Sequence, residues 1–148
     1  PVTVHWPIVL LSIGSFFYIF GYFRKNYFLD SGRILIILGT AGAWLAIYTG
    51  NLADGVVGRQ ICDPTVLKSH ENYAYYTAYV FSVIIIVEFL LQWLRVKHWL
   101  KQILHWILMA TMLTGLVLLT YVGHLGGSLV FDQAAGVTVP SEDCKGFE

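Results

Sequence analysis

The sequence predicts an all-α fold, an integral membrane, up-down four-helix bundle. Three observations predict this class. The chain has 148 residues, of which 57% are hydrophobic and 12% are charged, about half the charged share of an average soluble domain. It contains four apolar windows, at residues 7–23, 34–52, 73–94 and 103–122, joined by short connections. Short connections favour antiparallel packing of consecutive helices.

Each window is long enough to cross a bilayer. The windows contain 17, 19, 22 and 20 residues, which at a rise of about 1.5 Å per residue match a hydrocarbon core about 30 Å thick. Of the nine basic and nine acidic residues, only Glu88 lies inside a window. We therefore expect a single membrane domain over residues 1–148, with an outer loop at 53–72 and an outer tail at 124–148.

The first window is expected to be a retained helix rather than a cleaved signal peptide. No basic region precedes it in the sequence, and Arg24 and Lys25 follow it in place of small residues. Because the chain begins at Pro1, an initiator methionine or a longer leader is expected upstream.

Basic residues predict the orientation of the helices. The first and third connections hold most of them, namely Arg24, Lys25, Arg33, Arg95, Lys97 and Lys101. Short loops rich in lysine and arginine stay on the cytoplasmic side of a membrane. The second connection and the tail carry more acidic than basic residues. Both termini are therefore expected on the outer side.

Charge and cysteine content narrow the classes of function. The formal net charge is zero, which leaves no excess of basic residues to neutralise a nucleic-acid backbone. Cys62 and Cys144 fall in the outer loop and the outer tail. An oxidising compartment allows a disulfide there, and two free thiols are the alternative. The sequence has no Cys-x-x-Cys-His motif, so covalent haem attachment of the ordinary kind is excluded.

Three of the five histidines are expected at the outer surface. His5 precedes the first window, His70 precedes the third and His124 follows the fourth, whereas His98 and His105 lie at the inner end. A single histidine at a helix end is more often an interfacial side chain than a ligand. Three from separate segments indicate a ligand site, because imidazole binds haem iron, zinc and copper.

The preferred interpretation is one non-covalent haem b with His5 and His70 as axial ligands. The first and third helices of an up-down bundle are diagonal, so these two side chains face each other across its interior. His124 is the alternative axial ligand, or a partner for a propionate. Gly123, Gly126 and Gly127 flank it and give a flat ring close access to the backbone. A stripe of small residues at Gly39, Ala43, Ala46 and Gly50 is more simply explained by tight helix packing.

Glu88 is expected to face the interior of the bundle, because a carboxyl group inside a bilayer is costly. His105, on the fourth helix, is its candidate partner. A pair of this kind indicates a proton route or a hydrogen bond to quinone. A neutral Glu88 that hydrogen-bonds between helices is the structural alternative.

Short motifs, in their order along the chain, resemble those of a known family. They are Val4-His5-Trp6-Pro7-Ile8, Thr49-Gly50, His70-Glu71-Asn72, Gly126-Gly127-Ser128-Leu129-Val130-Phe131 and Gly136-Val137. This pattern resembles the bacterial four-span predicted membrane proteins known as domain of unknown function 2231. The resemblance implies a multi-pass protein of the bacterial inner membrane, whose first-motif and third-helix histidines look like haem b ligands. Here Trp6 stands where the family has Phe.

Three functions of different class follow from these observations. The first is a cytochrome-like subunit that transfers electrons between the quinone pool and a partner at the outer face, such as a cytochrome c or multihaem subunit of a redox complex. The second is a structural or anchor subunit without chemistry of its own. The third is a copper or zinc carrier or sensor that uses the outer histidines with Asp54 or Glu71. No nucleophile motif or phosphate-binding loop in the sequence supports a hydrolase.

Overall fold

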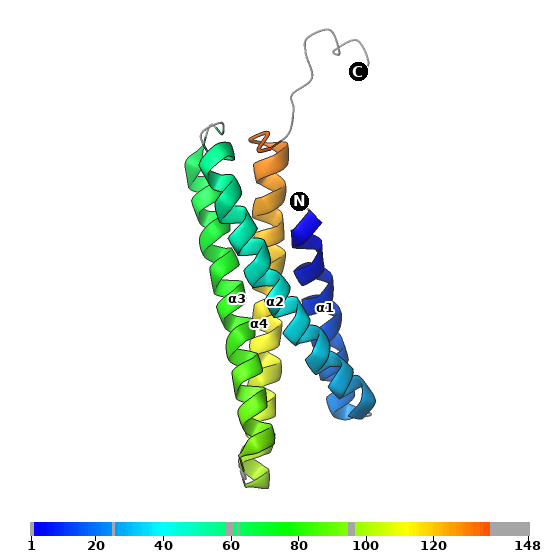
Figure 1. Ribbon diagram of the computed structural model, residues 1–148. Coiled ribbons are helices and arrows are strands. Elements are labelled where there is room, and N and C mark those ends of the chain that lie inside the picture. Colours follow the sequence, from blue (N-terminus) through cyan, green and yellow to red (C-terminus); the bar gives the residue numbers. More distant parts are fainter. Residues whose placement is uncertain (1, 25, 59–60, 62, 95–96, 137–148) are drawn as a thin grey trace.

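The chain folds into long α-helices, as predicted. The computed structural model describes residues 2–24, 26–58, 61, 63–94 and 97–136, with the side chains of residues 2, 56 and 57 left aside. These residues form α1 (Val2–Phe23), α2 (Asn26–Val57), α3 (Pro64–Trp93) and α4 (His98–Phe131). α1 begins at the same end of the molecule at which α4 finishes (Figure 1). The predicted all-α four-helix bundle is therefore confirmed.

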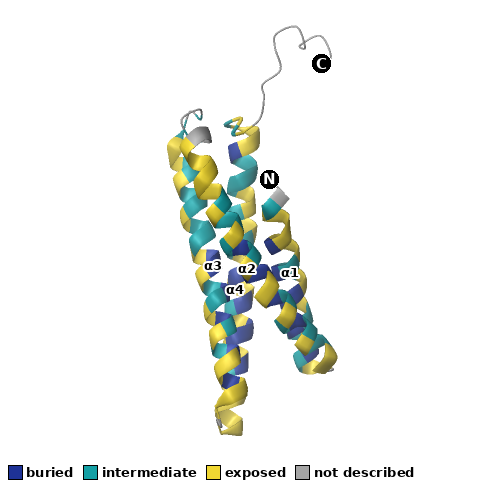
Figure 2. Cartoon of the chain, viewed as in Figure 1, coloured by how far each residue is buried: buried dark blue, intermediate teal, exposed yellow. Residues whose placement is uncertain are grey.

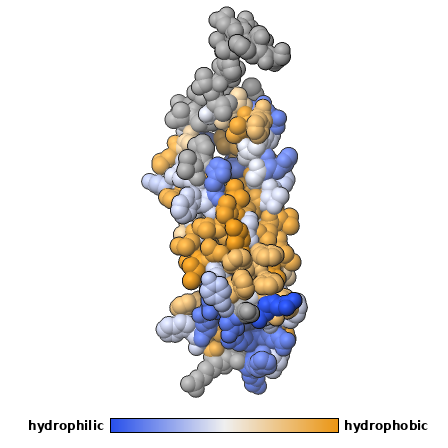
Figure 3. Space-filling model, turned by 90° about the vertical axis from the view of Figure 1, so that its right-hand side faces the viewer, coloured by the Kyte–Doolittle hydropathy of each residue, from blue (hydrophilic) through white to orange (hydrophobic). Residues whose placement is uncertain are grey.

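All four helices are long and apolar enough to cross a membrane. Their outward faces carry exposed isoleucine, leucine, valine and phenylalanine side chains, whereas buried residues gather where the helices face one another (Figure 2). One side of the molecule shows an apolar band between more hydrophilic ends (Figure 3). Lipid is the solvent that makes such an exposed apolar surface stable. The chain is a multi-pass membrane protein.

The helices pack as two hairpins, α1 with α2 and α3 with α4. Glycines allow the first hairpin to pack closely: a Cβ atom on Gly32 would lie 2.5 Å from the backbone nitrogen of Tyr18. Gly39 lies against Leu11, and Ala43 is buried, so this half of the small-residue stripe serves helix packing. At Gly50 a Cβ would meet no atom within 4 Å.

The helices extend beyond the apolar windows, which shortens the expected outer loop and tail. α2 continues to Val57 and α3 begins at Pro64, so most of the segment 53–72 is helical. α4 continues to Phe131, eight residues into the segment 124–148. Hydropathy detects only the part of a helix that lies in hydrocarbon. Asp63 then determines where α3 starts, because its side chain accepts a hydrogen bond from the Thr65 amide.

Candidate functional site

His70 is one of the three histidines expected on the outer side, and the structure holds its ring in place. It lies on α3, and its Nδ1 atom is 3.1 Å from the backbone carbonyl oxygen of Val122 on α4. Because a carbonyl oxygen only accepts hydrogen bonds, Nδ1 carries the proton and Nε2 of the neutral ring keeps its lone pair. Gly126 gives the ring space, since a Cβ atom there would lie 3.2 Å from Cε1 of His70.

The other two histidines expected on the outer side, His5 near the start of α1 and His124 near the end of α4, are exposed. Among the residues that the structure describes, no group of three or more His, Cys, Asp or Glu side chains is arranged to hold a metal ion. The three histidines therefore do not form a three-ligand site. An axial pair needs two ligands, so the pairing of His5 with His70 stays a prediction. Cys62 and Cys144 lie outside the described residues.

The neighbouring glycines differ in their surroundings. Gly126 contacts His70, whereas a Cβ atom on Gly123 or Gly127 would meet nothing within 4 Å. The backbone at these two positions is open to an approaching group, as a site for a flat ring requires.

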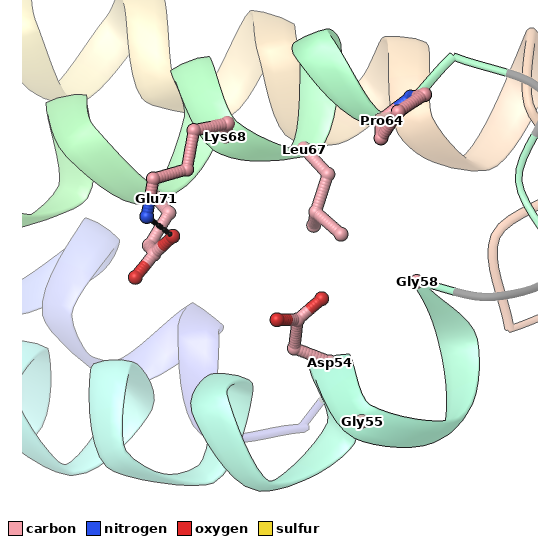
Figure 4. A pocket seen from close by; sticks show the side chains of 7 residues that line it. All are labelled: Asp54, Gly55, Gly58, Pro64, Leu67, Lys68 and Glu71. Carbon is pink, nitrogen blue, oxygen red and sulfur yellow. Dashed lines mark hydrogen bonds and ion pairs between the residues drawn. The ribbon is translucent and has the colours of Figure 1, made fainter.

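Asp54 and Glu71, the oxygen ligands expected for a copper or zinc site, line a cavity of about 450 Å³ between α2 and α3 (Figure 4). Glu71 is paired there with Lys68, at 2.6 Å between Oε2 and Nζ. The residues that line this cavity include no histidine. The described residues thus give a histidine–carboxylate metal site no support.

A second polar cluster lies deep in the bundle, and each helix contributes to it. Glu88 on α3 is at its centre, with 8% of its side chain exposed. Its Oε1 atom accepts from Nε of Arg33 at 2.7 Å and lies 2.6 Å from Nη2 of the same guanidinium. Its Oε2 atom accepts from the Tyr18 hydroxyl at 2.6 Å. We call Tyr18, Arg33, Glu88 and His105 the Glu88 cluster.

His105 is the fourth member, and it faces Glu88 as predicted from the sequence. Its Nδ1 atom is 2.8 Å from the carbonyl oxygen of Lys101, one turn earlier on α4, so Nδ1 carries the proton. Nε2 lies 3.9 Å from Oε2 of Glu88, beyond hydrogen-bond distance. The His105 ring stacks on Tyr22, with centroids 5.3 Å apart. The structure thus places Glu88 and His105 next to each other without a direct hydrogen bond between them.

A cavity of about 280 Å³ adjoins this cluster between α2 and α3. Tyr18, Arg33 and Glu88 form its polar side together with Asp30 and Gln92, and its other walls are apolar: Ile34, Ile36, Ile37, Ile84, Ile85, Phe89 and Met112. A membrane site with one polar side and apolar walls suits a ligand that is itself dissolved in lipid.

Comparison with known families supports the membrane assignment. The family model described as Predicted membrane protein (DUF2231) matches residues 1–139. The chain belongs to this family. The resemblance predicted from the short motifs is confirmed, and the match covers all four helices. Comparisons with curated proteins and with solved structures found no significant match.

Sequence reasoning placed Glu88 and His105 together but missed Arg33 and Tyr18. Arg33 lies one residue before the second apolar window, so it was counted only among the basic residues of the first connection. A signal was available: Glu88 lies six residues before the end of the third window, about 9 Å from the same membrane face at 1.5 Å per residue. That distance is within reach of a long arginine side chain that extends along the helix.

Proposed function

We propose that the chain is a b-type cytochrome-like subunit of the bacterial inner membrane, with one non-covalent haem b at its outer end. In this proposal it transfers electrons between quinone in the bilayer and a redox partner at the outer face, such as a cytochrome c or multihaem subunit. Both termini lie on the outer side in this proposal, as the basic inner connections favour. A reporter domain fused to the last residue tests that orientation.

One observation carries the proposal, the hydrogen bond between Nδ1 of His70 and the carbonyl of Val122. An imidazole that ligates a metal commonly donates its other ring N–H to a backbone carbonyl, which fixes the tautomer and the orientation of the ring. His70 has this arrangement and keeps Nε2 for a ligand. The open backbone at Gly123 and Gly127 agrees with a flat group nearby.

The residues present fit a haem: His70 would hold its iron together with His5 or, as the alternative, His124. Bound haem would supply one-electron redox chemistry. The chain supplies the rest: α3 and α4 fix the His70 ring between them, and Gly126 leaves space for that ring.

A reduced-minus-oxidised visible spectrum of the purified protein, supplied with haem b, tests the proposal. We expect split α and β bands in the wild type and their loss in His70→Ala and His5→Ala. His98→Ala is the matched control, because His98 is an exposed histidine at the opposite end of α4. Its spectrum should equal that of the wild type.

Three results would contradict parts of this proposal. A folded wild-type protein that takes up no haem would eliminate the cytochrome function. Bands that persist in His5→Ala and disappear in His124→Ala would instead show that α4 supplies the second ligand. Bound copper or zinc in a colourless protein, measured by elemental analysis, would favour the carrier hypothesis.

A further inference from the structure

The cavity beside the Glu88 cluster is open toward lipid. Ile34, Ile37 and Phe89 line it and are each at least half exposed on the outside of the bundle. Glu88, on the opposite side, is buried. A ligand that diffuses in the bilayer therefore reaches a buried polar group by entering between α2 and α3, without crossing water.

The charge of the site disfavours an anionic ligand. Arg33 is paired both with Glu88 and, through Nη1 at 2.6 Å, with Asp30. One positive and two negative charges leave a net charge of −1 on this polar side. A phosphate or a fatty carboxylate would meet repulsion there, because the guanidinium is already neutralised. The ligand class that fits is neutral.

The polar side both donates and accepts hydrogen bonds. Arg33 has five N–H donors, and its contacts with Glu88 and Asp30 engage one on each of its three nitrogens, so two more are available. Oε2 of Glu88 accepts from Tyr18 and, as a carboxylate oxygen, has capacity for a second donor. A carbonyl oxygen of a neutral ligand can therefore accept from Arg33, and a hydroxyl group of such a ligand can donate to Glu88.

The volume of the cavity and its apolar walls narrow the class of ligand further. The cavity volume of about 280 Å³ is just below the range of roughly 300–1,000 Å³ that is typical of sites for drug-sized ligands. It accommodates one substituted ring rather than an entire large molecule. Ile84, Met112 and Phe89 supply apolar contacts for that ring.

We propose that this cavity binds the headgroup of a lipid-soluble quinone, with Arg33 donating to the quinone carbonyl and Glu88 accepting from the hydroxyl of the quinol. Tyr18 is a positioning residue, because its hydroxyl holds Oε2 of Glu88 toward the cavity. The inference rests on the proposed function only for the source of the electrons. Binding itself requires no haem.

Equilibrium binding of a short-tailed benzoquinone to the full chain in lipid nanodiscs tests the proposal, with empty nanodiscs as the blank. The key variants are Ile37→Trp and Leu38→Trp. The two residues are neighbours on α2 with almost equal exposure, 50% and 53%, but only Ile37 lines the cavity. We expect Ile37→Trp to raise Kd at least about tenfold by filling the entrance, and Leu38→Trp to leave Kd unchanged.

Tyr18→Phe provides a second variant that removes one hydroxyl and keeps the ring. We expect its Kd to rise about fivefold, because Oε2 of Glu88 loses the hydroxyl that holds it toward the cavity, and thermal unfolding should show that the variant is folded. Binding should be the same in haem-free and haem-loaded protein, so a failed haem assay does not affect this result. Equal affinities of Ile37→Trp and Leu38→Trp, or no binding above the blank, would overturn the proposal.

Discussion

Arg33→Met gives the most direct test of the buried ion pair. The substitution keeps an unbranched side chain of similar reach and removes the guanidinium. Glu88 then loses both contacts to Oε1, at 2.7 and 2.6 Å, while 8% of its side chain is exposed. Removing one partner of a buried ion pair costs about 3–5 kcal/mol, because the other charge is left uncompensated. Asp30 also loses its partner, but it is 64% exposed and adds little.

The second substitution in this test, Glu88→Gln, removes the stranded charge. The amide that replaces the carboxylate still presents a carbonyl oxygen to the Tyr18 hydroxyl, which therefore keeps an acceptor. We expect the double variant Arg33→Met, Glu88→Gln to recover at least about 2 kcal/mol relative to Arg33→Met alone. Recovery by a second substitution is the signature of two side chains that act as a pair.

Unfolding by sodium dodecyl sulfate in mixed micelles, followed by tryptophan fluorescence, measures these free energies. Arg24→Met is the matched control, because Arg24 is an exposed arginine outside the Glu88 cluster, and its change should stay within about 0.5 kcal/mol. If the double variant is as unstable as the sum of the two single variants, Arg33 and Glu88 are not coupled and the reasoning fails.

Three further predictions concern other parts of the bundle. Gly32→Ala should cost about 1–3 kcal/mol, because its Cβ would lie 2.5 Å from the Tyr18 backbone; Gly50→Ala, in open space, should stabilise α2 slightly in the same unfolding assay. Ser15→Ala should raise stability by about 1 kcal/mol, since the buried Ser15 hydroxyl has no hydrogen-bond partner among the described residues. Hydrogen bonds donated by a hydroxyl and an amide in the first turn of α3 lower the pKa of Asp63 below its ordinary value of 3.8. The cap is thus fully formed above pH 3.8 and is lost as the pH falls through the lowered pKa of Asp63. Amide hydrogen exchange at the start of α3 should become faster over that pH range in the wild type. An exchange rate that does not change with the loss of the cap would contradict this.

The two candidate sites differ in how much of each could be predicted. At the end of the bundle where α3 begins, the sequence indicated His70 as a ligand, but the hydrogen bond to Val122 that fixes its tautomer joins residues 52 positions apart. Toward the opposite end, Glu88 stood out because it is the only charged residue in an apolar window. Its strongest partner, Arg33, did not, because a basic residue beside a window usually marks a membrane interface.

The location in a membrane, the number of helices and the depth of Glu88 could be predicted from the residues alone, because hydropathy and rise per residue are local properties of a chain. The loops are shorter than the apolar windows predicted, because the helices extend past the hydrocarbon core. A capping residue then sets the helix end, as Asp63 does at the start of α3. The contacts of Arg33 and Tyr18 with Glu88, and the cavity beside them, became visible only in the folded bundle. The rotation of each helix about its axis determines both, and that rotation follows from packing at positions such as Gly32 and Gly39 rather than from apolar content.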